Sequence, residues 1–431
     1  MLEEFKKRVA EGRTTVCVLG LGYVGLPLAA AFAEAGLSVV GYDVDRTKVI
    51  NVLAGKSGLR HFEGDEYMPY VVSGSLRVTD NLAEIEGCDA YVICVPTPLD
   101  DARSPDLRCV MSAVDTVGVS MRRGCLVALE STTYPGTTSE VVRERLERRS
   151  CLVAGDDFFL VYTPERQDPG NPVYKTRNIP KVIGGVTPQC LDAGMALYGR
   201  VMEECVPVST TDAAEMVKIF ENVYRAVNIA LVNEMKVLCH RLGIDVWEVV
   251  RAAGSKPFGF QPFYPGPGLG GHCIPIDPFY LSWRARQIGM STRFIELAGE
   301  INASMPEYVV RRAQDALDAH GLCMTGAGVL VLGVAYKPDV SDVRESPAVK
   351  VIRMLEEKGA DIWYHDPHVP ELGDMRSIQL TPSVVASADC VLLVTDHAQI
   401  DYGMVAEHAA LIVDARGRFF SERVSGEVVQ A

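Results

Sequence analysis

A short apolar run followed by three spaced glycines is the feature that most limits the fold of this chain. Val16-Cys-Val-Leu precedes Gly20-Leu-Gly22-Tyr-Val-Gly25, and a helical pattern follows. Gly20 permits a tight turn, Gly22 lets backbone approach a pyrophosphate, and Gly25 lets a helix pack closely on a strand. The first turn of the helix then offers unpaired N–H groups to an anion. The spacing therefore predicts a strand–turn–helix unit that binds a dinucleotide.

The residue that ends the next apolar run bears on the choice of cofactor. Residues 37–42 form that run, and Asp43 follows it. A carboxylate here accepts hydrogen bonds from the ribose hydroxyls of NAD and repels the 2′-phosphate of NADP. Arg46 and Lys48 stand close by and weaken this preference, so the sequence favours NAD over NADP. The residue pattern predicts a cofactor site made of Gly20, Gly22, Tyr23, Val24, Gly25, Asp43 and Arg46, with Thr97 and Thr132 from later loops.

Short apolar runs alternate with helical patterns over residues 15–208, which is typical of a parallel sheet covered on both faces. The runs predicted as strands are residues 15–19, 39–42, 90–95, 126–129, 158–162 and 182–185. A second series follows residue 319, with strands predicted at 329–333, 361–364, 391–395 and 411–414 and a helix at 348–358.

Between the two series the apolar period becomes that of one long helix. From Thr211 to His240, apolar residues recur every three or four positions, and Gly243 follows as a stop signal. Thirty residues of helix span about 45 Å, more than one small domain covers. We therefore predict a helix that links two domains and packs on its twin in a homodimer. The predicted fold class is α/β, with two Rossmann-like parallel-sheet domains (residues 1–208 and 320–431) joined by a central helical domain (209–319).

Charge and composition exclude several classes of protein. The 431 residues carry a formal net charge of −14 without a basic block, which argues against nucleic-acid binding. The sequence shows no signal peptide and no apolar run of about 18 residues, so we expect a cytoplasmic protein that does not insert in a membrane. The 12 cysteines include no Cys-x-x-Cys and no Cys/His cluster with metal spacing. We therefore expect free thiols in a reducing compartment and no metal site.

Cys273 stands in an unusual loop, Phe263-Tyr-Pro-Gly-Pro-Gly-Leu-Gly-Gly-His-Cys-Ile-Pro-Ile-Asp277. The glycines open an approach to the backbone, and the prolines stiffen the loop. A thiol on a rigid, open loop with a carboxylate four residues later predicts a nucleophile in a binding site. The alternative is a structural loop around a buried cysteine.

A nicotinamide cofactor combined with a nucleophilic cysteine indicates one type of chemistry. Thiolate addition to an aldehyde gives a thiohemiacetal, whose oxidation gives a thioester that water cleaves. The combination predicts a four-electron oxidation of a primary alcohol to a carboxylate. Lys218 and Asn222, spaced i, i+4 on one face of the long helix, would stabilise the oxyanion. The alternative places both on the solvated face of that helix.

Several motifs, in the same order, resemble the UDP-glucose/GDP-mannose dehydrogenase family of nucleotide-sugar 6-dehydrogenases. They are Gly20–Gly25, Val-Pro-Thr-Pro at 95–98, Glu130–Gly136, Thr163-Pro-Glu-Arg166, Lys218–Glu234, Gly270-Gly-His-Cys273 and Lys337–Pro347. The resemblance implies an NAD-binding domain, a helical dimerisation domain and a UDP-sugar-binding domain, in that order. It also implies NAD as cofactor and a UDP-sugar as substrate.

The resemblance assigns roles to individual residues. Cys273 would be the nucleophile, Lys218 and Asn222 the oxyanion donors, and Asp277 an aid to the water and proton steps. Glu165 and Thr132 would hold the catalytic water or act as base. The substrate site would comprise Glu165, Arg166, Lys218, Asn222, Phe263, Tyr264, Gly270 and Lys337, while Arg344 would reach the cofactor. Considered without the family, the Lys337–Pro347 segment is as readily a charged, solvated loop.

The chain departs from the glucose-specific branch at two positions. That branch has a lysine where this chain has Ile276 and an acid where it has Pro169. Residues 256–260 and 263–273 resemble instead the branch that oxidises UDP-N-acetylglucosamine. An apolar, aromatic-rich loop is also a reasonable wall for an N-acetyl methyl group. We therefore expect NAD-dependent oxidation of C6 of UDP-N-acetylglucosamine for surface polysaccharide. The alternatives are a UDP-N-acetylmannosamine dehydrogenase, a UDP-glucose 6-dehydrogenase, a two-electron 3-hydroxyacid-type dehydrogenase, and a non-enzymatic nucleotide-sugar sensor.

Overall fold

The computed structural model describes residues 1–59, 62–100, 104–167, 171, 173–271, 274–420 and 422–431. The chain forms two compact units, which we describe separately. Unit 1 comprises Met1–Glu221 and Trp283–Met290, and unit 2 comprises Asn222–Ser282 and Ser291–Ala431. The predicted boundaries at residues 208 and 319 divide the chain more finely and stay a prediction.

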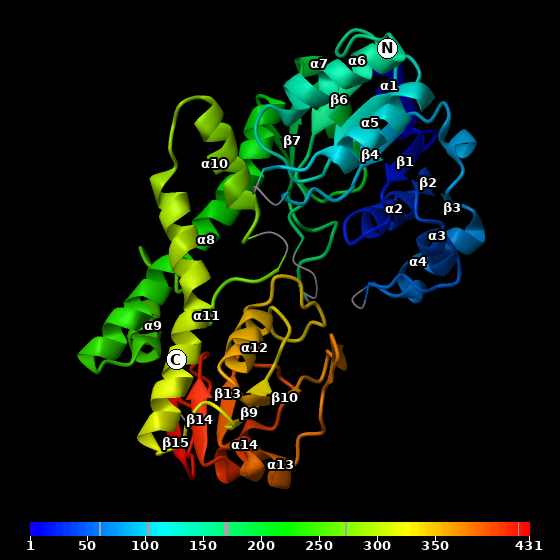
Figure 1. Cartoon of the computed structure of the whole chain (residues 1–431). Helices are drawn as coiled ribbons and strands as arrows, with labels where there is room; N and C mark the ends of the chain where they lie inside the picture. Colours follow the sequence, from blue (N-terminus) through cyan, green and yellow to red (C-terminus); the bar gives the residue numbers. More distant parts are fainter. Residues whose placement is uncertain (60–61, 101–103, 168–170, 172, 272–273, 421) are drawn as a thin grey trace. The chain divides into compact units, whose positions relative to one another are not determined.

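Unit 1 is built on an eight-stranded sheet in the order β3-β2-β1-β4-β5-β6-β7-β8 (Figure 1). The strands are β1 (Thr15–Leu19), β2 (Ser38–Tyr42), β3 (Leu76–Thr79), β4 (Ala90–Ile93), β5 (Leu126–Leu129), β6 (Phe159–Tyr162), β7 (Lys181–Gly185) and β8 (Cys205–Val208). The first six strands have the order of a doubly wound dinucleotide-binding sheet. The pair β6–β7 is antiparallel, whereas the other neighbouring pairs are parallel.

Helices cover both faces of this sheet because successive strand residues point to opposite sides. Val16 and Val18 belong to the same core as Phe32 and Leu197, while Cys17 and Leu19 belong to the core on the other face. The first core includes residues of α1 (Leu2–Ala10), α2 (Gly25–Glu34), α3 (Arg46–Leu53), α4 (Gly64–Ser73) and α7 (Pro188–Tyr198). The second includes residues of α5 (Arg108–Ser120) and α6 (Arg143–Ser150), beside the short helical turns Leu82–Ile85 and Thr137–Val142.

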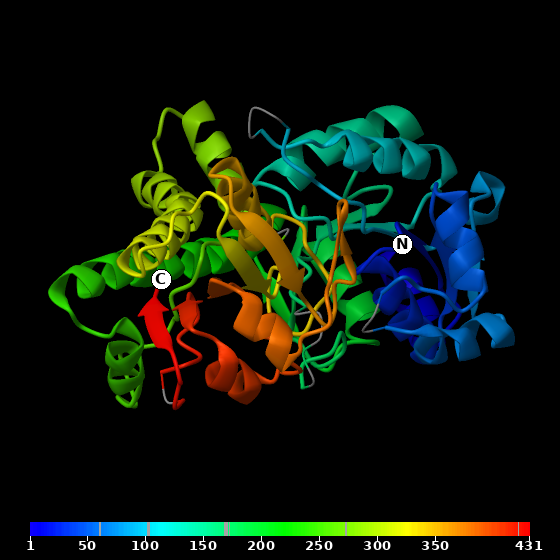
Figure 2. The ribbon, with the colours of Figure 1, turned by 60° about the horizontal axis from the view of Figure 1, so that its bottom comes forward.

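Unit 2 contains a five-stranded parallel sheet in the order β10-β9-β13-β14-β15. Its strands are β9 (Gly328–Leu332), β10 (Asp361–His365), β13 (Cys390–Leu393), β14 (Leu411–Asp414) and β15 (Glu427–Gln430), and a small hairpin joins β11 (Glu371–Leu372) to β12 (Met375–Arg376). One face packs on α11 (Arg293–Ala319) and α12 (Pro347–Glu357), and the other on α13 (Pro382–Ser387) and α14 (Tyr402–His408). Figure 2 shows β15 at the edge of this sheet, where the chain ends.

The predicted fold class is confirmed, including the long helix. This helix, α8 (Thr211–Leu242), has 32 residues and ends before Gly243, whose φ of +68° suits glycine. It contributes residues to both units, and α9 (Val246–Gly254) and α10 (Asp277–Gln287) follow it. The sequence patterns missed β3, β8 and β15, because each has only 4 residues and contains an arginine, a proline or a glutamate. Among the described residues, we find no helix with the length and apolar character of a membrane span.

Glu215 on α8 organises the loop after β5. Its side chain is fully buried and accepts hydrogen bonds from the backbone N–H groups of Gly136 and Thr138, both at 2.8 Å, and from the Thr138 hydroxyl at 2.7 Å. Burial raises the pKa of Glu215 to about 7, although these hydrogen bonds act in the opposite direction. The loop is therefore fastened to the helix by a carboxyl group that titrates near neutral pH.

Replacing Glu215 with Gln should make the free energy of unfolding less dependent on pH, because the amide cannot ionise whereas the buried Glu215 carboxyl group loses its proton as the pH rises. The pKa of Glu215 in the folded wild type is raised above its value in the unfolded chain. The stability that this group contributes is therefore fully present below the unfolded-state pKa and is lost as the pH rises through about 7. Urea unfolding should therefore show a larger wild-type advantage at about pH 5 than at about pH 8. Glu234→Gln, at an exposed position of the same helix, is the control. The same dependence on pH in both variants would contradict the prediction.

Candidate active site

The glycine-rich turn has the local geometry that the sequence predicts. Gly20 has a φ of +92°, and a Cβ on it would come within 2.7 Å of the Cys94 carbonyl oxygen. A Cβ on Gly25 would overlap the carbonyl oxygen of Gly20, so the helix α2 can start this close to β1 only with glycine there. Apart from the two neighbours of Gly22 in the chain, no atom of the described residues lies within 4 Å of the place where a Cβ on Gly22 would be. The open side of Gly22, at the start of a helix, fits the pyrophosphate of a dinucleotide.

Asp43 follows β2 and is buried beside this turn. Its Oδ2 accepts the N–H of Leu21 at 2.9 Å and the ammonium of Lys48 at 2.8 Å, and its Oδ1 accepts the N–H of Asp45 at 3.0 Å. Each carboxylate oxygen has two lone pairs. Oδ1 therefore keeps capacity for a ribose hydroxyl, while Lys48 offsets part of the negative charge.

The other predicted cofactor residues of unit 1 follow β1, β2, β4 and β5, whose carboxyl ends form one edge of the sheet; they are Tyr23, Val24, Arg46, Thr97 and Thr132. Thr97 is buried, Thr132 is partly buried and Tyr23 is exposed. The Arg46 guanidinium lies 3.9 Å from Asp80, and Lys48 rather than Arg46 is the cation that pairs with Asp43.

A network of buried charges lies at the same edge, and sequence reasoning missed it. Glu130, directly after β5, accepts the Tyr198 hydroxyl at 2.6 Å and the Lys181 ammonium at 2.7 Å. The same ammonium donates to Oε2 of Glu165 at 3.2 Å. Oε1 of Glu165 accepts the backbone N–H groups of the two residues that follow it, at 2.6 and 2.5 Å. A lysine just before an apolar strand and a glutamate just after one were the signals available in the sequence.

The protonation of this network follows from burial and charge. Burial by itself lowers the pKa of Lys181, but the charges of Glu130 and Glu165 outweigh it and raise that pKa. Burial raises the pKa of Glu130, against the attraction of Lys181. Burial also raises the pKa of the Tyr198 phenol, which stays a hydrogen-bond donor. The Lys181 ammonium is thus charged throughout the physiological range.

Lys218 and Arg166 connect the Glu165 loop to α8. Lys218 is buried, and its ammonium donates to the carbonyl oxygen of Glu165. The guanidinium of Arg166 lies 2.6 Å from the Glu221 carboxylate and donates to the Pro180 carbonyl at 2.9 Å. Lys218 therefore lies on a buried face of the helix rather than a solvated one, while its role in the reaction stays a prediction.

In unit 2, Asn222 and Asp277 form a buried pair. The Asn222 amide nitrogen donates to the Asp277 carboxylate, and the amide oxygen accepts from Arg225. Asn222 is 1% exposed and Asp277 is 3% exposed. The predicted nucleophile Cys273, with its neighbour His272, lies outside the described residues.

The described part of the cysteine loop packs on the segment that contains Lys337 and Arg344. A Cβ on Gly270 would come within 2.8 Å of the Tyr336 side chain, and Gly271 donates its N–H to the Arg344 carbonyl at 3.1 Å. The Lys337 ammonium lies 5.9 Å from the Tyr336 ring, whereas the Arg344 guanidinium is held by Asp342 at 2.6 Å. Two segments that the sequence analysis assigned to substrate binding are thus in contact.

The predicted substrate residues Phe263 and Tyr264 differ in environment. Phe263 is partly buried and meets the Tyr224 ring edge-on at 5.7 Å, while Tyr264 is 53% exposed.

A buried histidine holds the Lys337 segment at the sheet of unit 2. His397 accepts the backbone N–H of Asp339 on Nδ1 at 2.9 Å and lies 2.9 Å from the Asp366 carboxylate through Nε2. Asp339, His368 and His397 bring potential metal ligands within 4.8 Å of one another. Both nitrogens of His397 take part in hydrogen bonds within this cluster.

Three family models match this chain in order. The NAD-binding domain of the UDP-glucose/GDP-mannose dehydrogenase family matches residues 14–202, its central domain 212–304 and its UDP-binding domain 330–420. The chain belongs to the UDP-glucose/GDP-mannose dehydrogenase family. It is therefore an NAD-dependent nucleotide-sugar 6-dehydrogenase that acts on a UDP-sugar, as the sequence motifs predict.

Curated relatives and solved structures resemble this dehydrogenase over nearly its whole length. A UDP-N-acetyl-D-mannosamine dehydrogenase of Pyrococcus horikoshii is 37% identical, over 89% of this chain and 90% of its own. A UDP-N-acetyl-D-glucosamine 6-dehydrogenase of Pseudomonas aeruginosa is 34% identical over the same shares. The solved UDP-D-ManNAc dehydrogenase structure from Pyrococcus horikoshii has a TM-score of 0.89 and 32% identity, covering 97% of this chain and 99% of that one.

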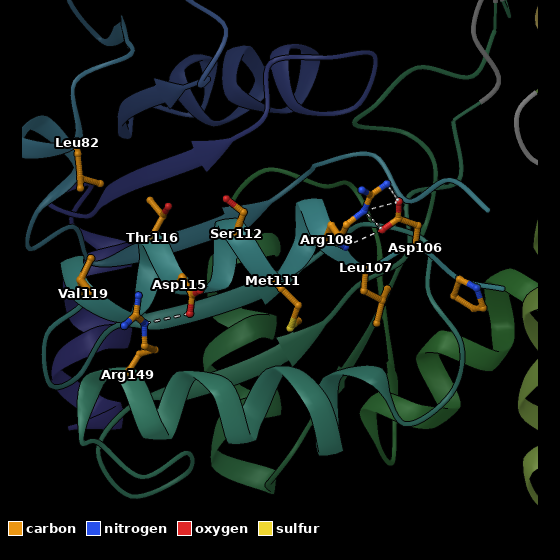
Figure 3. Close-up of a pocket in the computed structure, with 11 residues that line it drawn as sticks. Leu82, Asp106, Leu107, Arg108, Met111, Ser112, Asp115, Thr116, Val119 and Arg149 are labelled. Carbon is orange, nitrogen blue, oxygen red and sulfur yellow. Dashed lines mark hydrogen bonds and ion pairs between the residues drawn. The ribbon is translucent and has the colours of Figure 1, made fainter. Parts of the chain in front are cut away.

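A separate hollow of about 760 Å³ lies on α5 of the dehydrogenase and the turn before it (Figure 3). Its acidic and basic lining groups are paired: Arg108 contacts Asp106 at 2.6 Å, and Arg149 contacts Asp115 at 3.0 Å. None of the predicted site residues lines it, so we assign it no part in the reaction.

Asp43→Asn should reduce the preference of the dehydrogenase for NAD over NADP at least tenfold. The change removes the charge that repels a 2′-phosphate, weakens a charge-assisted hydrogen bond of about 1.5–3 kcal/mol, and releases Lys48 to attract the phosphate. The ratio of kcat/KM for the two cofactors measures this preference. Asp65→Asn, at an exposed position of α4, is the control and should leave the ratio unchanged. An unchanged ratio in Asp43→Asn would show that Asp43 does not select the cofactor.

Proposed function

We propose that this dehydrogenase oxidises the C6 hydroxymethyl group of UDP-N-acetylglucosamine to the carboxylate. The observation that carries the proposal is the sequence match to acetamido-sugar dehydrogenases over 89% of the chain. Exposed aromatic side chains that precede the cysteine loop in sequence support it, since Phe258 is 71% and Phe260 43% exposed. UDP-N-acetylmannosamine is the second candidate, favoured by the 37% identity to the Pyrococcus enzyme. The product would be a uronic acid nucleotide, formed in the cytoplasm for surface polysaccharide.

NAD, held by the glycine-rich turn and Asp43, supplies the hydride acceptor for both oxidations. The proposed role of Cys273 is covalent: its sulfur adds to the C6 aldehyde and leaves when water attacks the resulting thioester. One alcohol and one water thereby give one carboxylate and two reduced cofactors. Retaining the aldehyde on sulfur would prevent its escape between the two oxidations.

Lys218 and Asn222 are the proposed donors to the oxyanion, and both retain hydrogens for that role. The Lys218 ammonium has three hydrogens and contacts Glu165 with one, while the Asn222 amide nitrogen has two and contacts Asp277 with one. These partners fix the donors in advance, which is what transition-state stabilisation requires. Glu165 and Asp277 would accept protons from the thiol or the attacking water, with Thr132 beside the water.

Incubation with UDP-glucose, UDP-N-acetylglucosamine and UDP-N-acetylmannosamine tests the proposal by the absorbance of NADH. We expect the fastest turnover with UDP-N-acetylglucosamine and two NADH per sugar consumed. Cys273→Ser should abolish formation of the acid, whereas Cys323→Ser, at an exposed cysteine, should not. One NADH per sugar, or full acid formation by Cys273→Ser, would refute the thioester route. Faster turnover of UDP-N-acetylmannosamine would move the assignment to the second candidate.

We further propose that two copies of the chain associate through α8. Exposed apolar side chains recur along this helix at helical spacing: Met216, Phe220, Tyr224, Leu231, Met235, Leu238 and Leu242. Leu231 is 57% and Leu242 62% exposed, and a run of this length on one helix is typical of an interface. In a two-fold symmetric dimer both copies contribute the same surface, so the apolar side chains of α8 in one copy would pack against those of α8 in the other.

Leu231→Glu combined with Leu238→Glu should convert the dimer to a monomer, because each glutamate would place a charge in an apolar contact. Sedimentation should give twice the chain mass of 46.9 kDa for the wild type and this mass for the variant. Leu53→Glu, at an exposed leucine of α3, is the control and should stay dimeric. A monomeric wild type would contradict the proposal.

A further inference from the structure

We propose that Lys181 is a positioning residue for Glu165: its buried ammonium holds that carboxylate in one orientation. The inference rests on the part that the proposed function gives Glu165 in the water and proton steps. Lys181 itself is 5% exposed, so we assign it no contact with substrate.

Sheet topology brings the two residues together. β7 is antiparallel to β6, and Tyr162 pairs with Gly184 in their register. Continued past the end of β6, this register places Lys181 opposite Glu165. A parallel β7 would have put its first residue at the other edge of the sheet. The reversed strand therefore delivers a cation to the edge where the loops after β5 and β6 present their carboxylates.

The Lys181 ammonium contacts two carboxylates and lies beside one aromatic ring. Glu130 lies 2.7 Å away and Glu165 3.2 Å away, and the Tyr198 ring centre lies 5.7 Å from the ammonium. Other described titratable groups around Glu165 include Cys94, whose pKa burial raises, and Lys218, which donates to the backbone carbonyl of Glu165. Arg166, the next residue in the chain, pairs through its guanidinium with Glu221. Lys181 is thus the described cation that contacts the Glu165 carboxylate, and Glu130 is the described acid that competes for it.

Both oxygens of the Glu165 carboxylate have partners. Its Oε1 accepts two backbone N–H groups and its Oε2 accepts the Lys181 ammonium. Rotation of the carboxylate would break these contacts. Glu165 would therefore keep one orientation between the steps of the reaction.

Lys181→Met keeps the length of the side chain and removes the charge. Removing a cation beside a carboxylate makes protonation of the carboxylate easier. We expect the acid limb of the kcat/KM profile to move to higher pH, with kcat reduced and the KM for the nucleotide sugar changed less than about threefold. An acid limb in the wild-type position would overturn the inference.

Glu130→Gln should shift the kcat/KM profile in the direction opposite to Lys181→Met. A purely structural role of Lys181 would not produce opposite shifts in the two variants. The amide still accepts a hydrogen bond, but the competing negative charge is lost, so Lys181 and Glu165 interact more strongly. We expect the acid limb to move to lower pH in this variant. A shift in the same direction as in Lys181→Met, or no shift, would overturn the inference. Glu130→Gln preserves the size and shape of the side chain and leaves Lys181 in place, so it also decides the matter if Lys181→Met fails to fold.

Lys6→Met is the matched control, because it removes the same charge from α1 of the same unit, where Lys6 pairs with Glu3 and Asp192. It should leave the profile unchanged; a shift equal to that of Lys181→Met would overturn the inference by showing an effect of net charge. All rates are followed with whichever UDP-sugar the wild type oxidises fastest. A wrong assignment of the sugar would therefore be seen in the substrate preference of the wild type. A wrong role for Lys181 would be seen only in the pH profiles of the variants.

Discussion

The structure depends on one constraint: a polar or charged side chain that is buried must find a partner. The helix α8 meets this constraint repeatedly, and each time it fastens a loop. Glu215 binds the loop after β5, Lys218 binds the Glu165 loop, and Asn222 binds Asp277. Further along the helix, Asn233 and Lys236 bind the N–H and the carbonyl of Gly266, both at 3.0 Å. One helix thus fixes the backbone of loops that would otherwise be free to move.

The same constraint operates at the carboxyl ends of the buried strands. Asp43 after β2, Asp366 after β10 and Asp414 at the end of β14 each accept backbone N–H groups from the adjoining loop. Hydrogen bonds to a carboxylate favour its charged form; for Asp366, those from His397 and the loop outweigh burial and lower its pKa. Ligands bind at this edge of such sheets, and the three acids hold the backbone of the loops there through hydrogen bonds.

The elements that were predictable from sequence are those with a local cause. Continuous apolar runs located the strands around Val16 and Val391, and apolar periodicity located α8 to within two residues of its observed end. The glycine turn was predictable because its steric requirement involves neighbours in sequence. The Lys181–Glu130–Tyr198 network was not, because its members are far apart in sequence and meet only when β7 reverses direction. The His397–Asp366 contact was missed for the same reason.

A lysine suits the place between Glu130 and Glu165 better than a planar guanidinium would. The ammonium is a compact charge with three donors, and it can serve two carboxylates that approach from different loops. An arginine favours a bidentate contact with a single carboxylate and would draw one acid away from the other. Glu130 and Tyr198 fix the ammonium from the side of the core, which leaves its remaining attraction for Glu165. Glu130 is buried and has no proposed part in the reaction, but its charge competes for Lys181. Glu130 therefore sets how strongly Lys181 holds Glu165, the partly exposed acid that has the proposed part in the reaction.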